Sequence, residues 1–342
     1  MTLRVEQFAG DALEWDAFVR RQDGWTHFHL LGWKLIIDET FGHECLYLCA
    51  REESGALRGV LPLVRVRSLL FGHYLVSMPF LNHGGPLGDP AATRLLATHA
   101  VELAKRDGVK LLELRSRAPL SVPMRVSHRK ISVLLDLPAE GEAKLWKSFD
   151  PKLRSQIRRP QKDGATVRFG ADEVGPFHEV FARHMRDLGT PALPRRWFES
   201  VAQTFGDSAW FACAYMGGRA VAGGCALRWD GEVEITWASS LVEFKRSAPN
   251  MLVYWSMLQK AASEGVGVFN FGRCTPGGGT HRFKQQWGGR DETLWWYDHS
   301  AVEDAHTPSP DDGAYSWGPR IWKRLPVPLA TALGPRIVRY IP

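Results

Sequence analysis

The sequence predicts an α/β fold, of the mixed α+β kind, in which two halves are built alike. The chain has 342 residues, and at about 150 residues per domain this length suggests two domains. The same order of strand, turn, strand, helix and strand occurs twice. The second copy follows the first by 161 residues at positions 58 and 219, and by 157 residues at positions 106 and 263. A nearly constant offset indicates an internal duplication.

The first copy opens with apolar segments that the turn sequence "ESGA" separates. A stretch with apolar residues at helical spacing follows and stops at Gly108. The predicted elements are strands at 46–52, 57–66 and 73–80, a helix at 90–108 and a strand at 109–116.

The second copy repeats this order, and its helix stops at Gly265. The predicted elements are strands at 210–218, 219–229 and 232–240, a helix at 248–265 and a strand at 266–273.

A basic segment lies between the copies. Residues 144–168 contain eight Lys or Arg and two Asp. Asp150 is a good helix N-cap with Pro151 at the first helical position, and the helix should end or kink near Pro160. The segment is either a solvated linker helix or a clamp for phosphates, which guanidinium groups bind in bidentate fashion. The clamp residues would be Arg154, Arg158 and Arg159.

Composition places the chain among folded globular proteins, with 44% hydrophobic and 23% charged residues. The net charge of +6 is concentrated in the basic segment and in residues 313–342, which hold five basic residues and no acid. Five scattered cysteines in strand-like segments predict buried, reduced thiols and no metal site. The N-terminus lacks the pattern of a signal peptide, so we expect a cytoplasmic protein without a spanning helix.

Four segments, together with the duplication, resemble the FemAB family, and particularly the FemAB-like proteins that accompany PEP-CTERM/exosortase exopolysaccharide loci. They are "PFLNHGGPLGD" (79–89), "MRDLGTPALPRRWF" (185–198), "FNFGRCTPGGGTHRFKQQWG" (269–288) and the closing "WGPRIWKRLP…GPRIVRYIP". The resemblance spans nearly the whole chain. One departure is Cys274-Thr275-Pro276, where the subgroup usually has a serine and a basic residue.

The resemblance implies two tandem GNAT-like domains, each with a mixed, mainly antiparallel sheet flanked by helices. We expect an N-terminal domain at 1–140, the basic helix segment at 141–168, a C-terminal domain at 169–312 and a basic aromatic tail at 313–342. It also implies transfer of an aminoacyl group from aminoacyl-tRNA to an amine of a peptidoglycan precursor.

Acyl transfer to an amine passes through a tetrahedral oxyanion, which needs a positive group or an N–H donor beside it. In FemAB enzymes a Phe-Lys pair lies at the catalytic cavity, and the resemblance assigns this place to Phe283 and Lys284. Phe283 would form the cavity wall, and Lys284 would stabilise the oxyanion or hold the donor. A surface lysine after a flexible loop is the alternative.

The surrounding residues supply further candidates. Gly277, Gly278 and Gly279 do not match a phosphate-binding P-loop, since Gly278 stands where its lysine should be, and they predict an adaptable substrate lid or a plain connector. His281 is a candidate base or acceptor contact. Further substrate-binding candidates are Arg195, Arg273 and Trp287.

We therefore expect an acyltransferase with no bound cofactor and with aminoacyl-tRNA as co-substrate. The acceptor would be an amine of a cell-envelope or exopolysaccharide precursor, and no DNA partner is expected. A second interpretation is an acyl-CoA-dependent GNAT-like enzyme acting on a sugar amine, although neither half has the Gly-rich pyrophosphate loop of typical acetyl-CoA users. A third is a non-catalytic binding subunit of a polysaccharide-assembly complex.

The tail combines five basic residues with Trp317, Trp322 and Tyr340 around a short apolar middle. Cations with interfacial aromatic residues are typical of segments that contact an anionic membrane surface. The alternative is that the tail folds back and packs on the second domain.

Overall fold

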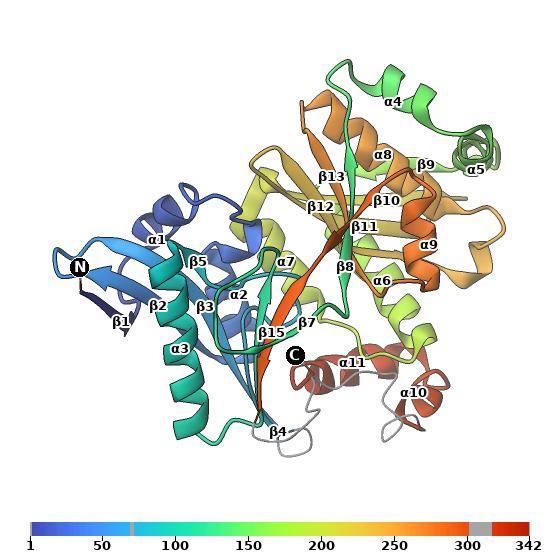
Figure 1. The fold of residues 1–342 in the computed structure, drawn as a ribbon. Helices are drawn as coiled ribbons and strands as arrows, with labels where there is room; N and C mark the ends of the chain where they lie inside the picture. The colour runs from blue at the N-terminus through green and yellow to red at the C-terminus, as the bar shows by residue number, and fades with distance from the viewer. Residues whose placement is uncertain (1, 69–71, 301–316, 342) are drawn as a thin grey trace. The chain divides into compact units, whose positions relative to one another are not determined.

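The computed structural model describes residues 2–68, 72–300 and 317–341, and the chain forms two compact units (Figure 1). Unit 1 contains the chain up to Arg129, a segment that begins at Thr293, and the last residues from Arg339 onward. Unit 2 contains Lys130–Glu292 and the C-terminal helices up to Val338.

Unit 1 has an eight-stranded sheet in the described ranges, with the spatial order β1, β2, β3, β4, β6, β15, β7, and with β5 paired to β3. The strands are β1 (Leu3–Gln7), β2 (Glu44–Glu52), β3 (Leu57–Ser68), β4 (Gly72–Val76), β5 (Leu87–Gly88), β6 (Leu111–Ser116), β7 (Arg125–Ser127) and β15 (Trp295–His299). The main helices are α1 (Ala12–Val19), α2 (Gly32–Phe41) and α3 (Pro90–Arg106).

Helix α3 covers β2 and β3. The Asp89 carboxylate caps its start by accepting a hydrogen bond from the backbone N–H of Ala92 at 2.8 Å. Leu96 and Ala100 lie four residues apart on one face and are fully buried against the sheet. The helix therefore begins and packs as its sequence predicts.

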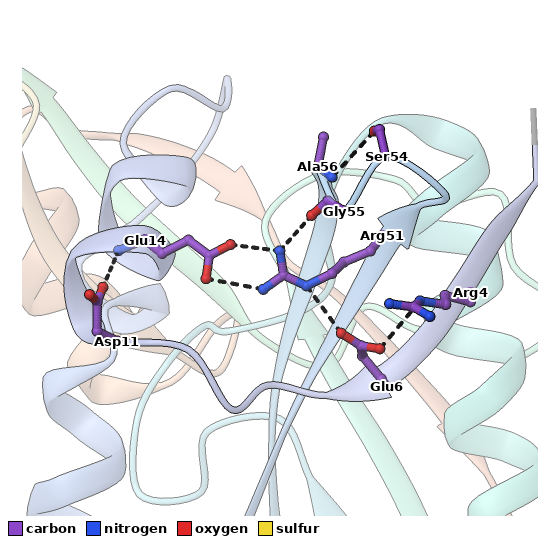
Figure 2. A network of polar contacts seen from close by, with 8 residues as sticks. All are labelled: Arg4, Glu6, Asp11, Glu14, Arg51, Ser54, Gly55 and Ala56. Carbon is purple, nitrogen blue, oxygen red and sulfur yellow. Dashed lines mark hydrogen bonds and ion pairs between the residues drawn. The ribbon is translucent and has the colours of Figure 1, made fainter.

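Polar contacts join the first strand of unit 1 to its first helix (Figure 2). The Arg51 guanidinium on β2 donates to both carboxylate oxygens of Glu14 on α1, at 2.6 and 3.0 Å. It also donates to the carbonyl of Gly55 at 2.7 Å and forms an ion pair with Glu6 on β1 at 3.1 Å. A bidentate guanidinium thus fixes three segments of the chain to one another.

Unit 2 has a seven-stranded sheet in the described ranges, in the order β14, β8, β13, β12, β11, β10, β9. The strands are β8 (Ile131–Asp136), β9 (Thr166–Phe169), β10 (Ala209–Met216), β11 (Arg219–Trp229), β12 (Glu232–Ser240), β13 (Val268–Cys274) and β14 (Arg290–Thr293). The helices are α4 (Glu142–Ser148), α5 (Pro151–Lys162), α6 (Val174–Leu188), α7 (Arg195–Phe205), α8 (Pro249–Ser263), α9 (Gly279–Gln285), α10 (Trp317–Trp322) and α11 (Val327–Val338).

Helices α6 and α8 cover opposite faces of this sheet. Two successive glycines of β11 show this, because neighbouring strand residues face opposite sides. A Cβ added at Gly223 would lie 3.1 Å from the ring of Phe177 on α6, whereas one added at Gly224 would lie 3.2 Å from Met257 on α8. Both helices therefore approach the β11 backbone more closely than a larger residue would permit.

The elements predicted for both copies are present in the fold. Strands 219–229 and 232–240 have their predicted bounds, and Asp230 and Gly231 join them with positive φ values of 35° and 74°. The strand expected at 73–80 instead ends at Val76. Met78 and Phe80 have φ values of 57° and 70°, which a strand does not accommodate.

Each sheet contains a strand from a part of the chain that we had assigned to the other domain. Strand β8, at 131–136, pairs with β13 in unit 2, although the expected N-terminal domain extended to 140. Strand β15, at 295–299, pairs with β6 in unit 1, although the expected C-terminal domain extended to 312. The compact units therefore differ from the expected ranges at both strands.

Helix α5 is an integral part of unit 2. Asp150 caps it as predicted, accepting from the N–H of Leu153 at 2.7 Å. Leu153 and Ile157 are buried, and the helix packs on α8. It ends at Lys162, two residues after Pro160 and close to the predicted end.

The helices of the tail pack on unit 2, whereas its last residues, from Arg339 onward, belong to unit 1. Helices α10 and α11 contact α6, and the Arg186 guanidinium of α6 donates to the carbonyl of Leu325 at 3.0 Å. Trp322 and Ala330 are buried. Over the described ranges, every helix is too short or too polar to cross a bilayer. The aromatic residue Trp317 begins α10, and residues 313–316 lie outside the described residues.

Candidate active site

The candidate site lies where the two parallel strands of unit 2 separate. β12 and β13 pair through only three residues each, ending at the pair Glu234 and Asn270. Two residues further on, Gly272 has a φ of +72°, and the register of β13 against β8 shifts at the same place. Ligands of open α/β sheets bind beyond the carboxyl ends of such strands, so this is the region of unit 2 to search.

Lys284 on α9 reaches this point from the following helix. Its side chain is buried, and its Nζ donates to the carbonyl oxygens of Gly272 at 2.6 Å and Arg273 at 2.8 Å. The pKa of Lys284 is lowered to about 8, mainly by burial; Cys274 and Glu234 oppose this shift, and Arg273 adds a smaller lowering effect. The lysine is therefore not the exposed surface residue of the alternative prediction.

An aromatic cluster surrounds the same helix. The ring of Phe283 is partly buried and meets Tyr254 of α8 edge to face at a centroid distance of 5.0 Å. Trp287 is 1% exposed, lies 6.0 Å from both Tyr254 and Phe271, and its Nε1 has no hydrogen-bond partner among the described residues. Part of the Phe283 ring thus remains accessible, whereas Trp287 supports the cluster from within the core.

His281 is held by both ring nitrogens. The backbone N–H of Gly277 donates to its Nδ1 at 2.9 Å, so Nε2 carries the proton and donates to the Asp291 carboxylate at 2.9 Å. The prediction that His281 acts as a base would require it to release Gly277. In this arrangement the imidazole instead connects the glycine loop to β14.

The glycine loop forms the start of α9. Gly277 has a φ of +74° and Gly278 is the N-cap residue, so Gly279 begins the helix. The N–H of Gly277 is used by His281, and that of Gly278 donates to the carbonyl of Thr275 at 3.2 Å. These two N–H groups are bonded inside the loop and are therefore not free to bind a phosphate.

The five arginines predicted to bind substrate lie in three places. Arg273 belongs to β13 and is half-buried beside Lys284. Arg195 begins α7, where it pairs with Glu199 at 2.8 Å, and no described contact joins it to α9. The three arginines of α5 form a separate surface: Arg154 is half-buried, Arg159 is exposed, and Arg158 lies 5.0 Å over the ring of Trp146.

The site also contains polar residues that the sequence analysis missed. Glu234 is fully buried and accepts hydrogen bonds from the Asn270 amide at 3.2 Å and from the Thr236 hydroxyl at 3.3 Å. Asp291 is the partner of His281. An available signal was the strand "EVEITW", where Glu232, Glu234 and Thr236 alternate with apolar residues in an otherwise buried sheet.

The burial of Cys274 argues against its acting as a nucleophile. The thiol is 6% exposed, and burial raises its pKa, an effect that Lys284 only partly offsets. A thiolate is the reactive form of cysteine. The departure at Cys274 therefore does not create an activated thiol.

Unit 1 has the same strand arrangement, but a side chain bridges it. β4 and β6 pair in parallel through three residues each, ending at Val76 and Glu113. Two residues beyond, where unit 2 has Gly272, unit 1 has Arg115, which is 1% exposed. Its guanidinium donates to Glu113 at 2.8 Å and to the carbonyl of Leu81, beyond β4, at 2.9 Å. Gly272 has no side chain that could close unit 2 in this way.

Comparisons with known proteins bear on the fold and on unit 2 as a domain. Residues 147–285, all within unit 2, match the family model described as an acetyltransferase (GNAT) domain. A search of curated proteins finds no match.

Several solved structures share the fold across both units. FemX is 14% identical, with a TM-score of 0.64 over 88% of this chain and 98% of that one. The C-terminal domain of a putative lysylphosphatidylglycerol synthetase from Agrobacterium fabrum is 14% identical, with a TM-score of 0.56 over 84% and 91%. A tandem GNAT protein from the clavulanic acid biosynthesis pathway is 12% identical, with a TM-score of 0.54 over 89% and 100%. The chain therefore has the FemX-like tandem GNAT fold expected from its sequence, and residues 147–285 match an acetyltransferase (GNAT) domain.

Proposed function

We propose that this protein is an N-acyltransferase of FemAB type, which moves an aminoacyl group from aminoacyl-tRNA to an amine of a cell-envelope or exopolysaccharide precursor. The observation that carries the proposal is the buried ammonium of Lys284, held by the carbonyls of Gly272 and Arg273 where β12 and β13 separate. A fixed positive group in a buried site can stabilise the oxyanion of acyl transfer.

In the proposed reaction the acceptor amine attacks the ester carbonyl of the aminoacyl donor. The carbonyl oxygen becomes an oxyanion, and the C–O bond to the ribose then breaks as the amine proton leaves and the ribose oxygen gains a proton. Lys284 has three N–H donors, of which two bind the carbonyls of the described loop. The third would donate to the oxyanion, and with a pKa of about 8 the group is mainly charged at neutral pH.

The neighbouring residues would position this donor. Phe283, packed against Tyr254, would form the apolar wall beside the reacting carbonyl. The hydrogen bonds from Gly277 to His281 and from His281 to Asp291 would hold the start of α9, and hence Lys284 on its next turn. In this account His281 is a positioning residue.

A polyanionic donor needs a basic surface, and α5 supplies one in the same unit. Arg158 and Arg159 are exposed, and Arg154 is half-buried on the same helix. Stacking on Trp146 holds the Arg158 guanidinium over the surface. We assign these arginines to the phosphates of the tRNA.

The acyl-CoA alternative is supported by the GNAT domain match. The start of α8 does not favour it, because it offers few free N–H groups for the phosphates of coenzyme A. Helix starts bind phosphates through free N–H groups. Here the N–H groups of Ser247 and Ala248 donate to the carbonyl of Phe244 at 3.0 and 3.2 Å, and Pro249 has no N–H. The fold likeness to a protein named for lysylphosphatidylglycerol synthesis also supports an aminoacyl group.

A donor test separates the three interpretations. Purified protein is given either tRNA charged with labelled amino acids or labelled acetyl-CoA, together with a muramyl-pentapeptide nucleotide or a glucosamine oligosaccharide. We expect the label to be transferred from tRNA to an acceptor. Ribonuclease should abolish this transfer, and Lys284→Met should lose it. Transfer from acetyl-CoA alone would support the alternative enzyme. Acceptor binding without transfer from either donor would support a binding subunit.

Donor binding is measured in parallel, because it does not depend on the choice of acceptor. A fluorescent RNA minihelix with an acceptor stem should bind the protein and should not be displaced by coenzyme A. Displacement by coenzyme A at comparable concentration would contradict the tRNA assignment.

A further inference from the structure

The C-terminal helices α10 and α11 have two chemically distinct sides. Trp322 of α10 and Ala330 and Gly334 of α11 are buried in unit 2. A Cβ added at Gly189, which ends α6, would lie 2.8 Å from the carbonyl of Pro319, so α10 sits against the end of α6. The packing that the sequence analysis offered as one alternative is therefore present.

The side that faces solvent is both apolar and basic. Ile321 is 55% exposed and Leu329 is 45% exposed, and both are among the largest exposed apolar side chains of the described chain. On α11, Arg336 lies seven residues after Leu329, which places both on the same exposed side. Four cations are exposed over these helices: Arg320, Lys323, Arg324 and Arg336.

No acidic residue offsets these cations within 317–341. The nearest acid along the adjoining end of α6 is Asp187, which pairs with Arg186 at 2.8 Å. Beside it, Leu188 at the last position of α6 is 53% exposed. The end of α6 therefore continues the apolar surface and adds no uncompensated negative charge.

We propose that the exposed side of α10 and α11 docks this protein on an anionic bilayer surface. The charge selects an anionic partner, and the isolated aliphatic side chains among the cations suit insertion at the level of lipid headgroups. A nucleic acid would use the cations but leave Ile321 and Leu329 in water. The proposal concerns attachment of the protein to a membrane and does not depend on which acyl donor the protein uses.

The docking is weak and depends on salt. A few cations and two aliphatic side chains amount to a peripheral contact, comparable to the single-signal membrane attachment that is marginal and reversible. Its electrostatic part is screened as the Debye length falls from about 30 Å at 0.01 M salt to about 8 Å at 0.15 M salt. Binding should therefore be observed at low salt on anionic vesicles and be lost on neutral ones.

The test is co-sedimentation of the full chain with phosphatidylcholine vesicles that contain about one third phosphatidylglycerol or none. Two variants change only the exposed side: Ile321→Asn with Leu329→Asn, and Lys323→Gln with Arg324→Gln. The matched control is Leu35→Asn on α2, whose side chain is 57% exposed in unit 1. Thermal unfolding verifies that each variant remains folded.

We expect wild type and the control to bind anionic vesicles, and each of the two α10–α11 double variants to bind at least about tenfold more weakly. One variant removes apolar side chains and the other removes positive charges. The proposal therefore requires that both variants bind vesicles more weakly. Failure of wild type to bind, equal loss in Leu35→Asn, or a loss only in the charge variant would overturn the proposal. A wild-type dimer that the apolar variant dissociates in light scattering would overturn it too, by assigning this side to a second copy.

Discussion

The ammonium nitrogen of Lys284 lies 2.6 Å from the carbonyl oxygen of Gly272, the residue that replaces the buried Arg115 of unit 1 at the end of the parallel strand pair. One glycine thus has two consequences. It leaves the end of β13 without a bridging side chain, and its carbonyl holds a lysine that arrives from the next helix. The buried cation in unit 1 is paired with Glu113, whereas the one in unit 2 binds only carbonyls in its described hydrogen bonds.

The pH dependence of turnover follows from the lowered pKa of Lys284. The folded pKa of about 8 lies below the ordinary 10.5, so the charged form is lost as pH rises through about 8. Donation to an oxyanion needs the charged form. We expect kcat/KM to fall above about pH 8 in a pH series with saturating second substrate. A rise through the same range that is absent in Lys284→Met would make Lys284 a base instead.

The same shift predicts how stability changes with pH. Between about 8 and 10.5 the unfolded chain binds more protons at this lysine than the folded chain does. The free energy of unfolding should therefore increase with pH in this window, by at most about 3 kcal/mol. Denaturant unfolding at several pH values measures it, and Lys284→Met should remove this part of the pH dependence.

His281 should affect turnover far less than a general base would. Because its Nδ1 accepts from Gly277 and its Nε2 donates to Asp291, we expect His281→Gln to lower turnover only about tenfold, by loosening the loop. Asp291→Asn should act in the same direction with a smaller effect. A loss of about 1000-fold in His281→Gln, with folding intact, would instead identify the base.

The arginines of α5 should set the salt dependence of donor binding. Arg158→Gln with Arg159→Gln should raise the KM for charged tRNA and reduce the slope of log affinity against log salt by about 1 to 2. The control is Arg20→Gln in unit 1, an exposed arginine that lies 5.4 Å over the ring of Trp25 as Arg158 lies over Trp146. If the double variant has the wild-type KM at every salt concentration, α5 has a structural role and does not bind the tRNA.

Arg115 should matter for stability and not for donor binding. Its removal leaves the carboxylate of the fully buried Glu113, among the described residues, with only a long ion pair to Arg129 at 3.5 Å. Breaking such a buried pair costs about 3–5 kcal/mol, so Arg115→Met should unfold at much lower denaturant concentration. The control Arg106→Met, at a side chain 71% exposed, should cost less than about 1 kcal/mol. A stable Arg115→Met variant with raised donor KM would place a ligand in unit 1.

Local patterns predicted most of the elements because each depends on nearby residues. The strands at 219–229 and 232–240 alternate and meet at Asp230-Gly231, and Asp150 marks the start of α5 by its own side chain. Lys284 was found through its resemblance to a known Phe-Lys pair. Its burial could not be predicted locally, since it depends on how α9 packs.

Pairings between distant segments were missed. Strand β8 pairs with β13, whose residues lie more than 130 positions later, and no local pattern specifies that partner. His281 and Asp291 are ten residues apart and meet only because β14 returns beside the glycine loop. The strand at 73–80 was predicted too long because apolar alternation continues through Met78 and Phe80, although their backbones have positive φ.

The central claim is tested most directly by the single-turnover rate of acyl transfer in Lys284→Met. The control is Lys130→Met, at a half-buried lysine that donates to the Thr275 hydroxyl in the loop before α9. Methionine keeps the length of the side chain and removes the charge. We expect Lys284→Met to react at least about 100-fold more slowly than wild type. Its free energy of unfolding should remain within about 1 kcal/mol of wild type, because relief from burying a charge offsets the two lost hydrogen bonds. Lys130→Met should react normally. A folded Lys284→Met that transfers the acyl group within tenfold of the wild-type rate would contradict the account.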